Sequence, residues 1–204
     1  MPDPARAYHH GDLRRALITR ALAVIDRDGL ADLSLRNLAR QVGVSHAAPV
    51  HHFGDKAGLL TAIATEGFLT LADELRCTYA DTASYLEVGV AYVRFAVRHR
   101  AYFQVMYRPE LYNPDDAGLE AARQQARAVL YGPLADRADV APSETRDAGL
   151  AAWALVHGLA TLLLTGNLPL DALRDPESLT RSVAAYLFAG QRGPRGMRRR
   201  TGQT

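Results

Sequence analysis

The chain has 204 residues, 48% of them hydrophobic, which is enough to form one large domain or two small ones around a substantial core. Its single cysteine, Cys77, excludes an intramolecular disulfide and argues against a cysteine-rich metal site, so we expect a reduced, cytoplasmic protein without a bound metal. The first residues lack the apolar stretch of a signal peptide, and the longest apolar run, 150–164, is interrupted by His157 and Gly158 and is too short to span a bilayer. We therefore expect no membrane partner.

Charge is unevenly distributed along the chain, although the formal net charge is only +2. Residues 1–60 hold eight Lys or Arg against six Asp or Glu, and residues 61–190 hold eleven against sixteen. Residues 191–204 hold five arginines and no acid, and their composition predicts a disordered basic tail. Basic ends attract phosphate groups, although for the tail alone a solvated run of charge is the simpler interpretation.

Apolar residues recur at a spacing near 3.6 along most of the chain, and no convincing strand pattern is present. The chain is therefore predicted to be all-α, with about nine helices. Asp12 is positioned to cap the first helix, and Gly29 to end it. A long helix capped by Asp55 is expected to continue to about Thr78 and to link the two halves of the chain.

The stretch SLRNLARQVGVSHAAPVHHF, residues 34–53, predicts two short helices joined by a tight turn. Ser34 can cap the first helix, and Gly43 can end it in the left-handed conformation that glycine adopts without strain. Ser45 can cap the second helix, in which Pro49 would take the fourth position and remove one backbone hydrogen bond. Crossed helices joined by a glycine-containing turn are typical of the helix-turn-helix of DNA-binding proteins. Many small helical domains contain the same corner, however.

Four further long helices are predicted in the second half of the chain. They are expected over 84–98, from Asn113-Pro114 to about Pro133, from Ser143 and Glu144 to Thr165, and from Asp175-Pro176 to Ala189. The helix that contains Trp153 and His157 is apolar nearly all round, so it is expected to be buried on several sides.

If the second short helix of 34–53 enters the major groove, its first residues meet base edges. His46 can donate to guanine, and the methyl groups of Ala47 and Ala48 can contact a thymine methyl. Arg36 can reach guanine or phosphate, and Lys56, the only lysine, lies at a helix N-terminus that attracts anions. An ordinary surface role is the alternative for each residue, but their clustering favours DNA binding. The predicted DNA-binding residues are Ser34, Arg36, Ser45, His46, Ala47, Ala48, His51, His52 and Lys56.

Residues 8–66 resemble the DNA-binding domain of the tetracycline-repressor-like (TetR/AcrR) family of transcriptional regulators. The likeness rests on a helix ending at Gly29, on LSLRNLARQVGVS, on a seven-residue recognition helix ending in HHF, and on GDKAGLL. The resemblance implies a helix-turn-helix domain at 8–66, a helical effector-binding and dimerisation domain at 67–190, and the tail at 191–204. WALVHGLA and YHHGDLR further resemble the subgroup with a WHG C-terminal domain.

The chain departs from the family pattern at two positions whose side chains usually contact phosphate. Val50 stands where tyrosine is usual, and Ala48 stands where threonine is frequent. We expect Arg6, His9 and His10 of a basic N-terminal arm, together with the two histidines of the recognition helix, to supply the missing contacts.

Aromatic and methionine side chains of the second half lie on segments that would converge in a helical bundle. The residues predicted to line a ligand pocket are Tyr92, Phe95, Phe103, Met106, Tyr107, Trp153 and His157. Plain core is the alternative for each aromatic residue. His157 discriminates best, because a neutral imidazole in an apolar helix needs a partner or lines a pocket. By resemblance, the pocket would hold an apolar or aromatic effector; no other cofactor is expected.

Together these features predict a ligand-responsive transcriptional regulator, most simply a repressor. By resemblance, it would bind a palindromic double-stranded DNA operator as a homodimer, through a four-helix interface made from 143–165 and 175–189 of two subunits, and a small-molecule effector would release it. Two alternatives stay open: a helical small-molecule-binding protein or adaptor with weak, non-specific DNA binding, and an enzyme. Against the enzyme, the sequence has no G-x-S-x-G, Walker A, H-E-x-x-H or G-x-G-x-x-G motif.

Overall fold

The computed structural model describes residues 4–135, 145–170 and 173–189, with side chains placed over 13–132, 145–170 and 173–186. Every regular element in these ranges is helical, which confirms the all-α prediction. The described α-helices are α1 (Pro4–Asp28), α2 (Leu35–Val42), α3 (Ala47–Phe53), α4 (Lys56–Thr82), α5 (Tyr85–Arg98), α6 (Arg100–Met106), α7 (Ala117–Ala135), α8 (Thr145–Thr165) and α9 (Pro176–Ala189), and one 3-10 turn, η1 (Pro109–Leu111), lies between α6 and α7.

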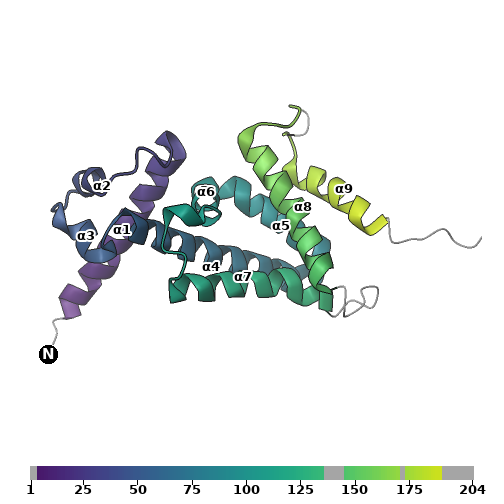
Figure 1. The fold of residues 1–204 in the computed structure, drawn as a ribbon, viewed down its shortest axis with the longest axis horizontal. Coiled ribbons are helices and arrows are strands. Elements are labelled where there is room, and N and C mark those ends of the chain that lie inside the picture. The colour runs from purple at the N-terminus through teal and green to yellow at the C-terminus, as the bar shows by residue number, and fades with distance from the viewer. Residues whose placement is uncertain (1–3, 136–144, 171–172, 190–204) are drawn as a thin grey trace, which may run out of the picture.

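The helices form two regions, which Figure 1 shows next to each other. The head consists of α1, α2 and α3, and the body consists of α4 to α9. Helix α4 begins beside α3 and continues into the body, where α7 lies alongside it and α5 packs against it. Helix α8 packs across α5 and α7, and α9 lies at the end of the body farthest from the head (Figure 1). The head is therefore attached to the body mainly by the long helix α4.

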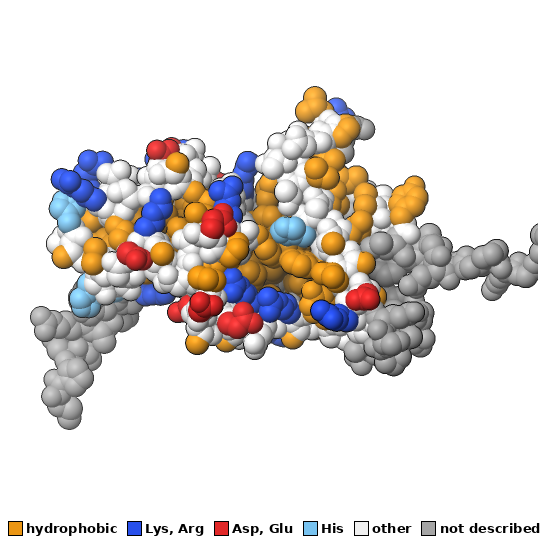
Figure 2. All heavy atoms as spheres, viewed as in Figure 1, with side chains coloured by type: hydrophobic (Ala, Val, Ile, Leu, Met, Phe, Trp, Pro, Cys, Tyr) orange, Lys and Arg blue, Asp and Glu red, His pale blue; other side chains and the backbone are white. Residues whose placement is uncertain are grey.

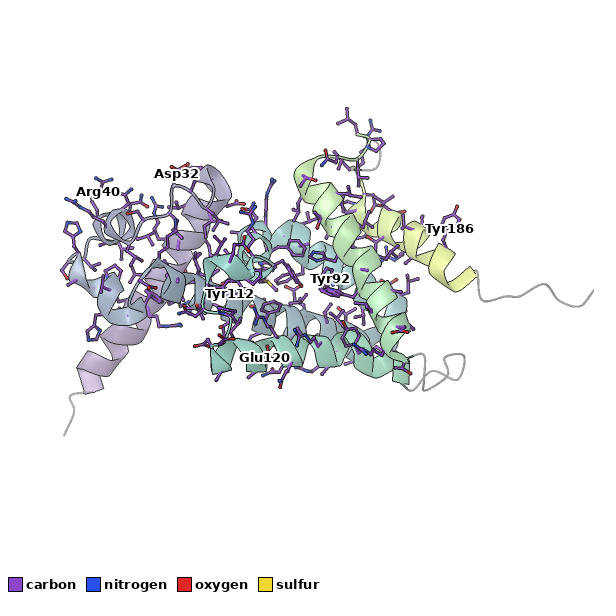
Figure 3. The ribbon with its side chains drawn as sticks, viewed as in Figure 1. Asp32, Arg40, Tyr92, Tyr112, Glu120 and Tyr186 are labelled. Carbon is purple, nitrogen blue, oxygen red and sulfur yellow. The ribbon has the colours of Figure 1, made fainter. Side chains whose placement is uncertain are left out.

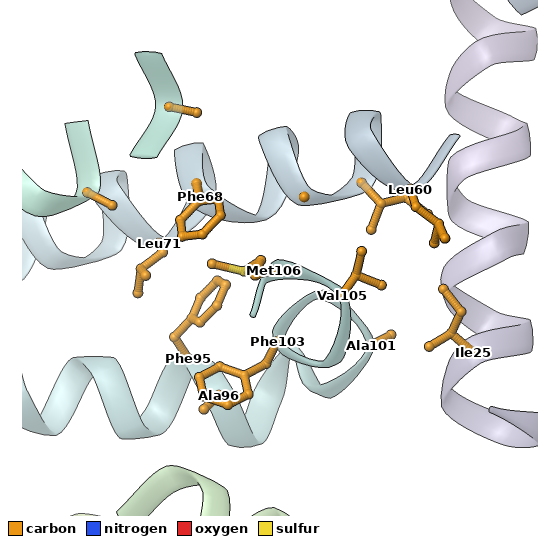
Figure 4. Packing of buried hydrophobic residues seen from close by; sticks show 14 of the residues in the cluster. Ile25, Leu60, Phe68, Leu71, Phe95, Ala96, Ala101, Phe103, Val105 and Met106 are labelled. Atoms are coloured by element: carbon orange, nitrogen blue, oxygen red, sulfur yellow. The ribbon is translucent and has the colours of Figure 1, made fainter. Parts of the chain in front are cut away.

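One hydrophobic core continues across the junction of the head and the body. Ile25 of α1 lies close to Leu60 of α4 and to Val105 of α6 in Figure 4, and all three side chains are buried. Helix α6 approaches α4 closely at Gly67, because a Cβ on that glycine would lie 2.7 Å from the sulfur of Met106. A displacement of α6 therefore changes its packing against both α1 and α4.

The turn between α2 and α3 has the geometry that the sequence predicts. Gly43 follows α2 with φ 77° in the left-handed region. The N–H of Val44 donates to the carbonyl of Ala39 at 3.0 Å, and the N–H of Gly43 donates to that of Arg40 at 3.3 Å, which together form a Schellman motif. Ser34 precedes α2 as its N-cap residue, but its side chain makes no capping hydrogen bond.

Two predicted helix starts in the head are wrong. Asp12 lies inside α1, which begins at Pro4, because proline is favoured in a first turn and the alanines and arginine that follow are strong helix formers. Ser45 is not the residue before α3: that position belongs to His46, whose φ of −60° and ψ of −22° are already helical. As a result, Pro49 lies in the first turn of α3, where its missing N–H would have had no helical partner.

Several helix limits in the body differ from the prediction by a few residues. Helix α4 continues past Thr78 to Thr82 and ends only where Ala83 adopts φ 50°. Helix α7 begins after Asp116, whose carboxylate accepts the N–H of Leu119 at 2.9 Å, and ends two residues beyond Pro133. Asp175 caps α9 as predicted, accepting the Ser178 N–H at 2.9 Å. Ser143 and Glu144 lie outside the described residues, as does the tail, 191–204.

Helix α8 is not buried on several sides within one chain, contrary to the prediction. Leu150 and Leu162 are 49% and 42% exposed, and Tyr186 of the neighbouring α9 is 82% exposed and points away from the body in Figure 3. By length and composition alone, α8 is also the described helix that is apolar enough to cross a membrane. The part of the chain that the structure describes leaves these apolar side chains of α8 exposed. The buried residues of α8 are Gly149, Val156, Leu159 and Ala160.

Candidate functional site

The outer face of α3 is the first part of the candidate site. His46, Ala47, Val50 and His51 are exposed, and Val50 is exposed by 51%. Residues 47, 50 and 51 are three and four positions apart, so they share one face of the helix. Pro49 is buried on the inner side. The head therefore presents a small apolar centre beside imidazole rings, and these groups suit contact with thymine methyls and base edges in a groove.

The junction of α3 and α4 fixes the direction of α3. Asp55 caps α4, because its Oδ1 accepts the N–H of Gly58 at 2.8 Å. A Cβ on Gly58 would lie 1.9 Å from the carbonyl oxygen of Phe53, so glycine is what lets the end of α3 rest on the first turn of α4. The guanidinium of Arg14 lies 5.6 Å from the Phe53 ring centroid. Gly58 is a positioning residue for α3 that the sequence pattern did not single out.

Lys56 has a partner inside the protein in addition to its predicted contact with phosphate. Its Nζ donates to the carbonyl oxygen of Leu30 at 3.0 Å, which joins the start of α4 to the loop after α1. An ammonium group has three donors, so two remain for phosphate oxygens. The carboxylate of Asp55 already caps this helix end, which weakens the attraction of a further anion to the helix dipole. A phosphate at this point would therefore be attracted by the Lys56 charge more than by the helix dipole.

The remaining residues predicted to bind DNA lie around the same surface but differ in exposure. Arg36 is exposed in the first turn of α2, where no acidic residue is present to neutralise it. Among the other predicted residues, Ser45 in the turn before α3 is exposed. Three more are half-buried, namely Ser34, Ala48 and His52. Residues 6–10, the predicted basic arm, belong to α1, and their side chains lie outside the described ones.

The second part of the candidate site is a cavity of about 440 Å³ in the body, bounded by α4, α6, α7 and α8. A volume of this size accommodates a small organic molecule. Figure 2 shows the face of the body that contains this hollow, with hydrophobic side chains within it and basic side chains along its α7 side. Aromatic residues form much of the wall, namely Phe68, Tyr107, Tyr112, Tyr131 and Trp153.

A hydrogen-bonded group of rings lies behind one wall of the cavity. The hydroxyl of Tyr92 is 2.7 Å from that of Tyr107 and 2.9 Å from Nδ1 of His157, and it accepts the Trp153 Nε1–H at 3.3 Å. Figure 3 shows Tyr92 between the helices of the body. Burial raises the pKa of Tyr92 and raises that of Tyr107 to about 12, while desolvation lowers the pKa of His157. These rings are therefore uncharged near neutral pH, as an apolar setting requires.

The residues predicted to line a pocket divide into three sets in the structure. The first set, which borders the cavity, is Met106, Tyr107 and Trp153. The second set, Tyr92, Phe103 and His157, forms the layer behind it, and the Phe103 and His157 rings stack with centroids 5.3 Å apart. Phe95 is the third: it is fully buried beside His99 and is not among the described residues that line the cavity.

Several residues that line the cavity were not identified from the sequence. Phe68 comes from the middle of α4, Tyr112 follows η1, and Arg123 lies on α7. Phe68 and Arg123 are 55 positions apart in the chain, and nothing in the sequence around any of the three residues indicates a cavity. Only the packing of α7 against α4 brings them together.

Comparison with known proteins gives concordant results for both regions. The family model described as "Bacterial regulatory proteins, tetR family" matches residues 17–63, and that described as "Tetracyclin repressor-like, C-terminal domain" matches residues 85–186. The HTH-type transcriptional regulator BetI of Escherichia coli K12 is 26% identical over 183 residues, which cover 82% of this chain and 90% of that protein. The likeness to the WHG subgroup stays a prediction.

Solved structures with the same fold cover nearly the whole chain. A protein of unknown function from Rhodococcus sp. RHA1 has a TM-score of 0.76 and 34% identity, and the match covers 90% of this chain and 97% of that one. A bacterial regulatory protein in the tetR family from Rhodococcus RHA1 has a TM-score of 0.66 and 21% identity, with coverage of 88% and 95%. The head and the body thus occur together in these proteins as they do here.

Proposed function

This chain belongs to the tetR family of bacterial regulatory proteins and is a DNA-binding transcriptional regulator, and we propose that it is a dimeric repressor released from its operator by a small molecule. The observation that carries this proposal is the course of α4. This helix starts at Lys56, beside the DNA-facing α3, and contributes Phe68 and Leu71 to the wall of the cavity. A ligand in the cavity therefore contacts the same helix that positions the DNA-binding surface.

The proposed DNA contacts centre on the exposed face of α3. His46, Ala47 and Val50 would meet base edges, while Arg36 and Lys56 would pair with phosphate. The phosphate contacts would fix the register of the head, and the contacts of α3 would select the sequence. Two heads related by a twofold axis would read a palindrome with half-sites about 34 Å, or a multiple of that distance, apart.

The proposed dimer uses the exposed outer face of α8, which carries apolar and threonine side chains, together with α9. Leu150, Ala154, Thr161 and Thr165 repeat at intervals of four and seven, so their exposed side chains follow one stripe along the helix. No atom of the described residues lies within 4 Å of the position of a Cβ on Gly158, which leaves room for the backbone of a second helix. Because α8 is largely uncovered in the single chain, we propose that it pairs with a second copy instead of entering a membrane.

The proposed response to ligand passes through α6 and α4. Met106 of α6 borders the cavity and rests on Gly67 of α4, so a ligand that moves Met106 also displaces α4 relative to α6. The shift would change the separation of the two heads in the dimer. Its size is limited by the difference between the ligand affinities of the two conformations. We further propose a cytoplasmic regulator and not an enzyme, since the hydroxyl of Tyr92 is already engaged by Tyr107 and His157.

Selection of bound sequences from a random DNA pool tests the proposal directly. We expect enrichment of a palindrome, and its binding should weaken with salt because phosphate contacts release counterions. In Arg36→Ala and Lys56→Ala, the slope of log K against log salt should fall by about 1 each. The control is Arg76→Ala, which lies twenty positions along α4 from Lys56, about 30 Å away.

Two results would count against this function. Failure to enrich any sequence would exclude an operator-binding regulator. An unchanged salt slope in both Arg36→Ala and Lys56→Ala would exclude the proposed docking. Because Lys56 also bonds to Leu30, thermal unfolding of that variant is measured in parallel, so that a loss of folding is not mistaken for a loss of phosphate contact.

A further inference from the structure

The charged side chains that face the cavity are all of one sign. Among the described lining residues, Arg123 and Arg127 carry charge and none is Asp or Glu. Both arginines lie on α7, one helical turn apart, and therefore on the same side of the cavity. Met106 and Trp153 reach the cavity from other helices, α6 and α8, and Tyr107 follows α6. The cavity thus has a cationic edge and an apolar, largely aromatic interior.

Arg123 is fixed in place by its neighbours and is mostly withdrawn from water, with its side chain 15% exposed. Its guanidinium carbon lies 5.9 Å from the ring centroid of Phe68 and 5.4 Å from that of Tyr112. One Nη donates to the hydroxyl of Tyr112 at 2.9 Å and the other to the carbonyl of Pro114 at 3.1 Å. A guanidinium has five N–H donors, so others remain available to a ligand.

The acidic partner of this arginine pair does not neutralise it. Nη1 of Arg123 lies 3.6 Å from one carboxylate oxygen of Glu120, and Nη1 of Arg127 lies 3.3 Å from the other. Two guanidinium groups thus share one carboxylate, which leaves about one positive charge. Glu120 is 41% exposed and is not among the described lining residues, so water weakens its effect on the cavity.

An aromatic cavity by itself would suit a cationic ligand. Here a cation would meet a guanidinium that already lies over two of the rings, and like charges repel more strongly near a group that is only 15% exposed than in bulk water. A carboxylate, in contrast, can accept two parallel hydrogen bonds from one guanidinium. The electrostatics of the cavity therefore favour an anion.

The rings of Tyr107 and Trp153 are preorganised to pack against a flat apolar group. The hydroxyl of Tyr92 bonds to Tyr107 and accepts the Trp153 N–H, so both rings are fixed before a ligand arrives. The cavity volume of about 440 Å³ is large enough for a single ring or for two fused rings. We propose that the cavity takes a small aromatic carboxylate, whose carboxylate pairs with Arg123 and whose ring packs against Tyr107 and Trp153. The inference rests on the proposed function, in which this ligand is the effector.

Trp153 provides the measurement, because it is the only tryptophan of the chain and lines the cavity. The full-length protein is titrated with three probes that share a benzyl group: phenylacetate, phenylacetamide and phenethylammonium. We expect a saturable change in tryptophan fluorescence with phenylacetate, at a dissociation constant about tenfold or more below those of the other two. Equal affinity for the amide, tighter binding of the ammonium, or no response to any probe would overturn the proposal.

Arginine variants locate the anion. Arg123→Gln should weaken phenylacetate binding about tenfold and leave phenylacetamide binding unchanged, while Arg127→Gln, which is more exposed, should have a smaller effect. Arg76→Gln, outside the cavity, is the matched control. If Arg123→Gln fails to fold, as judged by circular dichroism, Arg123→Lys keeps the charge but loses the bidentate geometry and should show a reduced preference for the carboxylate. A preference unchanged in that variant would contradict the assignment.

Operator binding separates this inference from the function on which it rests. Suppose the protein binds its selected operator in the absence of probes and binds none of the three probes. The proposed operator binding is then supported, and the proposed ligand class is wrong. Suppose instead that phenylacetate is preferred and Arg123→Gln abolishes the preference, but no DNA sequence is enriched. The proposed ligand class is then supported, and the repressor proposal is wrong.

Discussion

The head and the body use side chains in opposite ways. In the head, His46, Val50 and Arg36 are exposed, and short-range features such as a Schellman turn and a capping carboxylate set their position. In the body, the hydroxyl of Tyr92 is buried and contacts Tyr107, which follows α6, and His157 of α8. The difference shows why a DNA-reading surface can be recognised in one stretch of sequence, whereas a ligand cavity has to be assembled from several helices.

The largest expected effect is at the junction of the two regions. Gly58→Ala places a Cβ 1.9 Å from the carbonyl oxygen of Phe53, so α3 must move away from α4. We expect a loss of about 3 kcal/mol in the free energy of unfolding and a severe loss of operator affinity. Urea unfolding and DNA titration measure the two effects. Gly132→Ala, at an exposed helical position with open space around it, should instead be neutral or stabilising by about 0.5–1 kcal/mol.

If Gly58→Ala unfolds at the wild-type midpoint and binds DNA normally, the close contact of α3 with α4 is not required. The head would then depend less on this junction than the structure implies, and the comparison between locally and globally determined regions would have to be redrawn.

A smaller effect is expected inside the body. Tyr92→Phe removes a hydroxyl that Tyr107, Trp153 and His157 contact, which leaves partly buried polar groups without this partner. We expect a loss of about 2 kcal/mol in stability, together with a change in the fluorescence of Trp153. Tyr186→Phe, at an 82% exposed position, should stay within about 0.5 kcal/mol of the wild type. Equal stabilities of the two variants would show that the buried hydroxyl is not needed.

In the head, single methyl groups on the DNA should be detectable. Replacing the thymines of the selected operator by uracil, one at a time, removes the C5 methyl that Val50 is proposed to contact. At one position in each half-site we expect a loss of about 0.8 kcal/mol, or roughly fourfold in affinity. Val50→Ala should bind thymine and uracil there more equally. Val97→Ala, at a 42% exposed position on α5, is the control and should keep the wild-type sensitivity.

The smallest effect concerns a surface ion pair that joins α5 to α9. Arg181 donates to both carboxylate oxygens of Glu87 at 2.8 Å, and this hydrogen-bonded pair lowers the pKa of Glu87. Glu87→Gln should lose about 0.5 kcal/mol at neutral pH. Because the folded pKa is depressed, the advantage of the wild type is present above the unfolded carboxyl pKa, about 4.3, and disappears as the pH falls through the folded value. Thermal midpoints of both proteins between neutral and acidic pH test this, and a pH-independent difference would contradict it.

The sequence alone predicted much of the head because its signals are local. Gly43 and Asp55 act through hydrogen bonds to residues within five positions, and such bonds depend little on the remainder of the chain. Where a local signal competed with another, the prediction was wrong. Asp12 can cap a helix, but α1 begins eight residues earlier, at Pro4, because the alanines that follow Pro4 favour helix.

Tertiary structure decided the body. Whether Phe95 faces a cavity or the core, and whether α8 is covered, depends on which helices pack beside them, and periodicity does not contain that information. Arg123 became part of a cavity only because α7 lies against α4, far from it in the chain. Caps and turns are thus determined by residues that are neighbours in the sequence. A binding cavity depends instead on the mutual packing of helices, because its walls come from segments that meet only in the folded chain.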